Sequence, residues 1–136
     1  MSAVFSLFVC TFAVASGHSM FHQRFEGATT LTKDLVREGL LHAEADGSHS
    51  LLCHITGEDG VTRSETCTLG PEEIDRSMGC MSVWGGDDIV KMGCWRQQDI
   101  SLSVCTKRAC LSQEKRGGFN FCCCFGDNCN AKYGEL

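Results

Sequence analysis

The stretch that decides the fold is FCCCFGDNCN at residues 121–130, in which three consecutive cysteines are followed by a fourth at position 129. A disulfide needs Cα atoms about 4.4–6.8 Å apart, so adjacent cysteines cannot all be joined to one another without severe strain. Neighbouring residues of a strand also point to opposite faces of a sheet. Each of Cys122, Cys123 and Cys124 must therefore reach a different part of the chain, and the segment predicts a centre of crosslinking.

Cysteine usage indicates an oxidising compartment. Residues 3–16 form a short apolar run that ends in small residues, which is typical of a secretory signal peptide, so we expect residues 1–17 to be removed. A buried N-terminal helix is the alternative. Of the eleven cysteines, removal would leave an even set between Cys53 and Cys129. Such a dense set in a secreted domain predicts a disulfide framework, although spacing alone does not choose among the pairings.

Charge and hydropathy exclude several classes of protein. The net charge is −5, and no run of basic residues predicts binding to nucleic acid or to an anionic membrane surface. After the signal segment, no apolar stretch approaches the roughly 18 residues that a transmembrane helix needs. As written, the chain is expected to be secreted and extracellular; as a fragment of a full receptor, it would lie on the outer side of the plasma membrane.

Residues 18–50 contain no cysteine and mix histidine, serine, glycine and charged residues. We predict a flexible N-terminal extension, to which we assign no function. Apolar positions within residues 31–41 also indicate a turn or two of amphipathic helix capped by Thr30 or Thr32, although Gly39 weakens that interpretation.

Residues 51–133 are predicted to form a single small all-β, disulfide-rich domain, followed by a tail at residues 134–136. A domain of this size needs added constraint, which disulfides worth about 2–4 kcal/mol each would provide. Short strands flanking turn-rich segments predict three hairpins. They pair residues 51–56 with 61–67, residues 78–84 with 89–95, and residues 101–105 with 119–124, the last pair enclosing a polar loop at residues 112–118.

Strand alternation predicts the register of the second hairpin. If Cys80 and Cys94 both face the crosslinked interior, they stand opposite each other. Trp84 then stands opposite Val90, and residues 86–88 form the loop tip. The other face carries Met81, Val83, Ile89, Lys91, Gly93 and Trp95. One face of so thin a domain is expected to be exposed, and an exposed apolar face is a candidate binding surface.

Two motifs resemble the extracellular domains of type II receptors of the TGF-β superfamily, with the activin and bone morphogenetic protein branch the most similar. They are DIVKMGCW at residues 88–95 and the FCCC and DNCN groups within residues 121–130. The segment CMSVW at residues 80–84 is similar to the one that precedes the same hairpin. The similarity runs from Cys53 to Tyr133, and it implies a three-finger toxin-like fold with three hairpins and five disulfides.

The resemblance also implies how the cysteines pair. Carried over one by one, the pairs are Cys53–Cys80, Cys67–Cys94, Cys105–Cys123, Cys110–Cys122 and Cys124–Cys129. This assignment sends the three adjacent cysteines to three separate partners, as the geometric argument requires.

In the activin-receptor branch, three aromatic residues on a concave face form the ligand-binding patch. The matching positions here hold Met81, Trp95 and Phe121, and Lys91 lies beside them on the inferred face. Met81 replaces the usual aromatic residue, which puts the choice of ligand in doubt, although a flexible thioether can also fill an apolar pocket. The implied partner is a dimeric growth factor of the activin or bone morphogenetic protein type, with a type I receptor as a further partner through the shared ligand.

Each candidate residue also has a structural alternative. Trp95 could be a core tryptophan packed on a disulfide, but its position opposite the cysteine-bearing face favours binding. Strand alternation does not decide whether Phe121 belongs to the core or to the binding face, and the resemblance favours the binding face. Lys91 alone would be an ordinary solvated charge. Trp84 shares the parity of the cysteines and is predicted to be structural.

No metal, cofactor or enzyme activity is expected. Zinc sites favour cysteine pairs at close spacing, often with histidine, and the histidines here are scattered. No catalytic motif is present, and the kinase domain that full receptors carry is absent from this sequence. The alternative function is that of a secreted three-finger protein of the toxin or lymphocyte-antigen type, acting on a channel or cell-surface receptor through its loop tips. The small, acidic tip at residues 85–88 counts against it.

Overall fold

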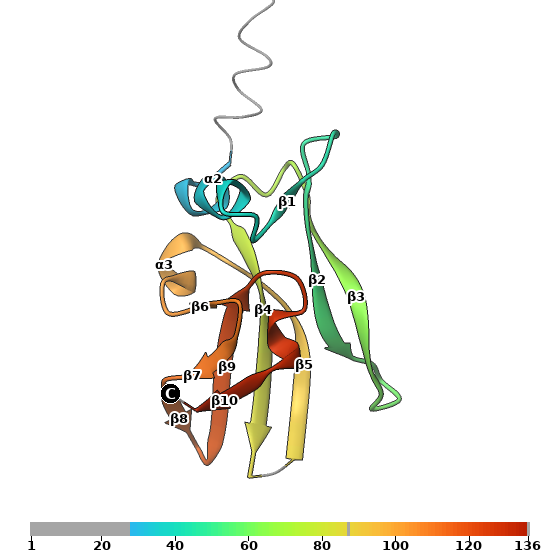
Figure 1. Ribbon diagram of the computed structural model, residues 1–136, viewed down its shortest axis with the longest axis vertical. Coiled ribbons are helices and arrows are strands. Elements are labelled where there is room, and N and C mark those ends of the chain that lie inside the picture. Colours follow the sequence, from blue (N-terminus) through green and yellow to red (C-terminus); the bar gives the residue numbers. More distant parts are fainter. Residues whose placement is uncertain (1–27, 87, 136) are drawn as a thin grey trace, which may run out of the picture.

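The structure, a computed structural model, describes residues 28–86 and 88–135, so the predicted signal peptide lies outside the described residues. Three strand pairs project from a base that the short helix α2 covers (Figure 1). The elements are α2 (Thr30–Arg37), β1 (His42–Ala43), β2 (His49–Thr56), β3 (Thr62–Leu69), β4 (Ser77–Gly85), β5 (Asp88–Gln97), α3 (Asp99–Leu102), β6 (Thr106–Lys107), β7 (Cys110–Ser112), β8 (Glu114–Arg116), β9 (Phe119–Phe125), the 3-10 helix η1 (Cys129–Ala131) and β10 (Tyr133–Glu135).

The first finger is the antiparallel pair β2–β3, which confirms the first predicted hairpin. Its turn closes through a hydrogen bond from the Gly57 amide to the Val61 carbonyl, 2.9 Å long. The Asp59 side chain accepts the Val61 N–H at 3.0 Å, and Gly60 adopts a φ of +75°, which glycine tolerates without strain. The turn-rich residues therefore act as the sequence predicts.

The second finger, β4–β5, has Cys80 opposite Cys94, as predicted. The predicted partner of Trp84 is wrong. The register shifts by one residue after Val83, so Trp84 pairs with Ile89 and Gly85 pairs with Asp88. A β-bulge places two residues of one strand against one of the other, which a strict two-residue period cannot anticipate. The tip is consequently shorter than predicted, and its Asp87 lies outside the described residues.

The third finger differs from its prediction. β9 pairs antiparallel with β8, through a turn in which Gly117 and Gly118 have φ values of +59° and +82°. Residues 101–105 do not pair antiparallel with β9: Ser101 and Leu102 end α3, and the chain then joins β9 through the parallel strand β6. Leu102 is buried, so packing of a helical turn prevails over the local strand pattern. Part of the predicted polar loop is also strand, in β7 and β8.

The segment before the first finger is not an extension over its described part. α2 begins after Thr29, whose side chain accepts the Thr32 N–H at 3.1 Å, so neither predicted cap residue is the N-cap. The helix ends at Arg37 with Glu38 as the C-cap; Gly39 then turns the chain with a φ of +73°, and the Leu40 N–H donates to the Leu35 carbonyl at 2.8 Å. This is a Schellman C-cap, so the glycine that weakened the helical interpretation belongs to the motif that ends the helix.

The predicted domain boundaries at residues 51 and 134 cut through elements of the structure. β2 begins at His49, two residues before the predicted boundary. Tyr133, Gly134 and Glu135 of β10 pair in parallel with β7, so the described part of the predicted tail belongs to a sheet.

All ten cysteines of the described chain form disulfides, with Cα–Cα separations between 4.6 and 5.9 Å. The pairs are those that the resemblance implies: Cys53–Cys80, Cys67–Cys94, Cys105–Cys123, Cys110–Cys122 and Cys124–Cys129. The first two join the first finger to the second. The other three tie β9 to the β6 side, to β7 and to η1, so the cysteine triplet is the centre of crosslinking that its spacing predicts.

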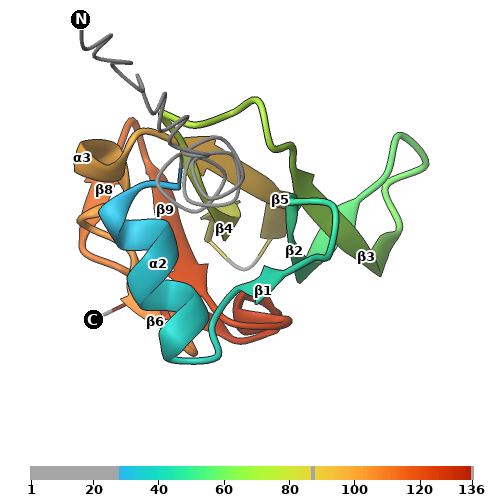
Figure 2. The ribbon, with the colours of Figure 1, turned by 90° about the horizontal axis from the view of Figure 1, so that it is seen from above.

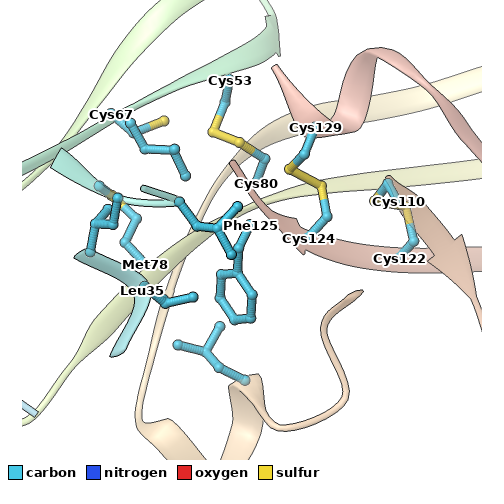
Figure 3. Packing of buried hydrophobic residues seen from close by; sticks show 14 of the residues in the cluster. Leu35, Cys53, Cys67, Met78, Cys80, Cys110, Cys122, Cys124, Phe125 and Cys129 are labelled. Atoms are coloured by element: carbon cyan, nitrogen blue, oxygen red, sulfur yellow. A yellow bond between two sulfur atoms is a disulfide. The ribbon is translucent and has the colours of Figure 1, made fainter. Parts of the chain in front are cut away.

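The core lies where these disulfides meet the apolar side chains of the base. Leu35 of α2, Met78 of β4 and Phe125 of β9 pack together with the cysteine pairs (Figure 3). Leu40 and Leu41, which follow the helix, are at most 2% exposed. Seen from above, α2 lies across the base while β2 and β3 project to one side (Figure 2). The cysteine-free segment therefore supplies part of the core of the domain.

Candidate ligand-binding face

The predicted binding residues lie on three neighbouring strands in the order β5, β4, β9. In the central strand, Met81 stands between Gly93 of β5 and Cys123 of β9. Trp95 is two residues further along β5, opposite Gly79, and Phe121 is opposite Val83. Because side chains two residues apart in a strand point to the same face of the sheet, Met81, Trp95 and Phe121 share one face. We call these three residues the aromatic patch.

The two rings of the aromatic patch are in contact across the central strand. The ring centroids of Trp95 and Phe121 are 5.0 Å apart, and the ring planes are tilted by 58°. This tilted arrangement is one that aromatic pairs prefer over a face-to-face sandwich. Both side chains are half-buried, so part of each ring is accessible.

Met81 is more deeply buried than the sequence predicts. It is 8% exposed, whereas the analysis of the second hairpin expects an open face around it. Its sulfur lies 3.9 Å from the position that a Cβ on Gly93 would occupy, so the thioether extends over the neighbouring strand. The methionine therefore forms part of the floor of the face, and the accessible surface is provided mainly by the two rings.

Lys91 is exposed and pairs with Val83 on the same face as the aromatic patch. Within the described part of the chain, it takes part in none of the five ion pairs. An exposed ammonium at the rim of an apolar surface contributes more to the orientation and rate of association than to affinity.

The opposite face of the same strands is structural. Trp84 is 6% exposed and its ring centroid lies 4.9 Å from that of Tyr133 in β10, which confirms the prediction for Trp84. Cys80 and Cys94 carry the disulfides to the first finger on this side. With its back held by covalent and aromatic contacts, the sheet presents the aromatic patch on a fixed backbone.

A pocket of about 580 Å³ opens beside the aromatic patch. Its lining residues are Trp95, Ser101, Val104, Leu111, Gln113, Phe121, Cys122 and Cys123. The sequence analysis assigned no role to Val104 or Leu111. Val104 immediately precedes Cys105, and the disulfide from Cys105 to Cys123 brings this segment to β9. The residues around Val104 contain no local pattern that predicts its place beside Trp95.

The described residues contain no cluster of three or more histidine, cysteine or acidic side chains placed to hold a metal ion. None of the helices in the described ranges has the length and apolar character needed to cross a membrane.

The three fingers and the crosslinked base define a small, disulfide-rich three-finger domain. The family model of the activin types I and II receptor domain matches residues 49–135 of the chain. The chain therefore belongs to the activin receptor domain family, and its domain is an extracellular, ligand-binding one.

Curated relatives agree with this assignment. The chain is 29% identical over 85 residues to activin receptor type-2B of Xenopus laevis, which covers 60% of the chain and 15% of the relative. It is 32% identical over 80 residues to activin receptor type-2A of the same species, which covers 56% of the chain and 15% of the relative. The chain thus matches only a small fraction of the length of these receptors.

Proposed function

We propose that the domain binds dimeric growth factors of the activin or bone morphogenetic protein type through the aromatic patch. The observation that carries the proposal is the contact between Trp95 and Phe121 on an otherwise crosslinked sheet, in a domain of the activin receptor family. Lys91 contributes at the rim. The domain acts either as a receptor ectodomain or as a soluble ligand trap, and a type I receptor joins through the same ligand.

The energetics favour the two rings as the main source of affinity. Aromatic side chains bury about 150–250 Å² each, and apolar burial contributes about 25 cal/mol per Å² before association costs are subtracted. Binding hot spots are enriched in tryptophan, and they lie in well-packed positions surrounded by contacts of little energy. Trp95 fits this description because it is half-buried and its ring packs against that of Phe121.

The first test is surface plasmon resonance of the secreted, fully oxidised chain against a panel of activins and bone morphogenetic proteins. We expect saturable binding to a subgroup of the panel. Absence of binding to every member would overturn the proposal and favour the three-finger alternative that acts on a channel or cell-surface receptor.

Trp95→Ala tests the aromatic patch. We expect an affinity loss of at least about 30-fold, or about 2 kcal/mol, because the ring supplies the central contact. Trp95→Phe should lose less, since it keeps a ring against Phe121. Ile74→Ala, an exposed residue between β3 and β4, is the control and should bind as the parent does. A variant that folds, by near-ultraviolet circular dichroism, yet binds normally would contradict this site.

A further inference from the structure

The pocket beside the aromatic patch has an uncharged lining. Its walls come from Trp95 of β5, from residues 99–104, which we call the α3 turn, from β7 and the residue after it, and from β9. Four polar or sulfur-bearing side chains contribute, but none of the eight lining residues carries a formal charge. A cavity of about 580 Å³ falls within the roughly 300–1,000 Å³ range of ligand pockets. The chemistry of the lining therefore suits an apolar group.

The walls of the pocket are held in place by covalent and buried contacts. The Cys105–Cys123 disulfide, with Cα atoms 4.6 Å apart, fixes the segment that carries Val104 against β9. Leu102 of α3 is 1% exposed, and the Asp99 carboxylate accepts the Leu31 N–H at 3.2 Å, which anchors α3 to α2. Because the pocket is preformed, filling it incurs little ordering cost.

The other wall is also crosslinked. β7, which carries Leu111, is joined to β9 by the Cys110–Cys122 disulfide and pairs in parallel with β10. α3 lies on the β9 side of the sheet, away from the first finger, in both ribbon views (Figures 1 and 2), and β7 lies on the same side in Figure 1. The pocket is thus built by the third finger and the α3 turn, together with Trp95 and Phe121 of the aromatic patch.

The pocket and the aromatic patch share Trp95 and Phe121. A protein that covers the outer surface of these rings also covers the mouth of the pocket. Leaving an apolar pocket unfilled at such an interface forfeits the dispersion contacts that an apolar side chain would make with its lining. Val104, which lines the pocket, is 56% exposed in the free domain and therefore offers an apolar surface to a ligand.

We propose that this pocket receives an apolar side chain of the same growth factor that binds the aromatic patch, and that it contributes to ligand choice. The inference rests on the proposed function, because the occupant belongs to the ligand that covers Trp95 and Phe121. Met81 is buried and does not line the pocket, so the pocket supplies apolar contact surface in addition to that of the aromatic patch.

Val104 and Ile100 make a matched pair for the test. Both are exposed apolar residues of the α3 turn, at 56% and 80%, but only Val104 lines the pocket. Val104→Arg blocks the pocket with a charged side chain, whereas Ile100→Arg places the same charge on the same turn outside it. Ser101→Arg, on an exposed lining residue, serves as a second blocking variant if Val104→Arg does not fold.

The measurement is surface plasmon resonance of the secreted chain and its variants against each growth factor that the parent binds. We expect Val104→Arg or Ser101→Arg to weaken binding about tenfold or more and to change the ranking of the ligands, with Ile100→Arg within about threefold of the parent. Equal effects of Val104→Arg and Ile100→Arg, or no effect of either blocking variant, would overturn the proposal that the pocket receives a side chain of the growth factor.

The two proposals fail differently. If no growth factor binds, or if Trp95→Ala binds normally, the proposed function fails and the pocket proposal fails with it. If Trp95→Ala loses binding while folded Val104→Arg and Ser101→Arg keep it, the aromatic patch stands and the pocket has no part in the interface. Binding of a small apolar dye that Val104→Arg abolishes, without any change in growth-factor affinity, would assign the pocket to a small molecule and overturn the inference.

Discussion

At the scale of single residues, Asn130 holds the back of the binding sheet together. It is completely buried in η1, where its side-chain oxygen accepts the His54 N–H at 2.8 Å. Its amide nitrogen donates to the carbonyl oxygens of His54 at 2.9 Å and of Met81 at 3.0 Å. One side chain thus satisfies backbone groups of the first and second fingers, including the residue that forms the floor of the aromatic patch.

We predict that Asn130→Ala destabilises the oxidised domain by about 2–4 kcal/mol, because it leaves buried backbone groups of two strands without partners. Denaturant unfolding with the disulfides intact measures the change. Ser64→Ala is the control: it removes a 2.6 Å hydrogen bond to Asn128 that is exposed, and it should cost much less. Equal losses in the two variants would contradict a special role for Asn130.

At the scale of elements, α2 is the part of the fold that the sequence indicates only weakly. A helix of eight residues is marginal on its own and depends on tertiary packing. Leu35 provides that packing in the core, while the opposite side of the helix carries exposed residues such as Lys33. Local propensity could not reveal this, because the partners of α2 are in β4 and β9, far along the chain.

Leu35→Ala should therefore destabilise the domain by about 2–5 kcal/mol through the cavity that it leaves. Lys33→Ala, on the same helix, should change stability by no more than about 0.5 kcal/mol. Thermal unfolding of the secreted chain distinguishes them. A small effect of both would mean that α2 is peripheral, as the sequence analysis expected of this segment.

The connection between β9 and η1 also links distant elements. Asp127 Oδ1 accepts the Leu52 N–H at 3.0 Å, and Oδ2 lies 2.7 Å from Nε2 of His42 in β1. Partial burial acts to raise the pKa of Asp127, but the Leu52 N–H and the His42 ring outweigh it and hold the pKa below its usual value of 3.8.

Because the folded-state pKa is lowered, Asp127 stabilises the fold above pH 3.8, and this contribution is lost as the pH falls through the lower folded-state value. Asp127→Asn should therefore flatten the acid limb of the stability curve below about pH 4. The effect is small, since the pair is exposed and screened by solvent. Melting temperatures between pH 2 and 7 test it, with Asp75→Asn as the control. A steeper acid limb in Asp127→Asn would contradict the assignment.

At the scale of the whole molecule, the predictable parts of the fold were those with a local signal. The first two hairpins follow from alternating strands around glycine-rich turns, and the disulfide pairs follow from the resemblance. α3, β6 and β7 are elements of two to four residues held by Cys105 and Cys110, and such elements have no pattern of their own. Residues of α3, of β7 and of the positions that follow them line one side of the pocket, so the sequence could predict the aromatic patch but not the pocket beside it.

The five disulfides fall into two groups that share no segment of chain. Two join residues within 53–94, and three join residues within 105–129. A single break of the backbone between residues 96 and 104 would therefore leave two covalently separate pieces. Non-covalent contacts would hold them together, among them the pairing of β4 with β9 and the hydrogen bonds of Asp127 and Asn130 to the first finger. Trp95 would remain on one piece and Phe121 on the other. The exposed segment that contributes Ser101 and Val104 to the pocket is therefore also the covalent connection between the two halves of the binding face.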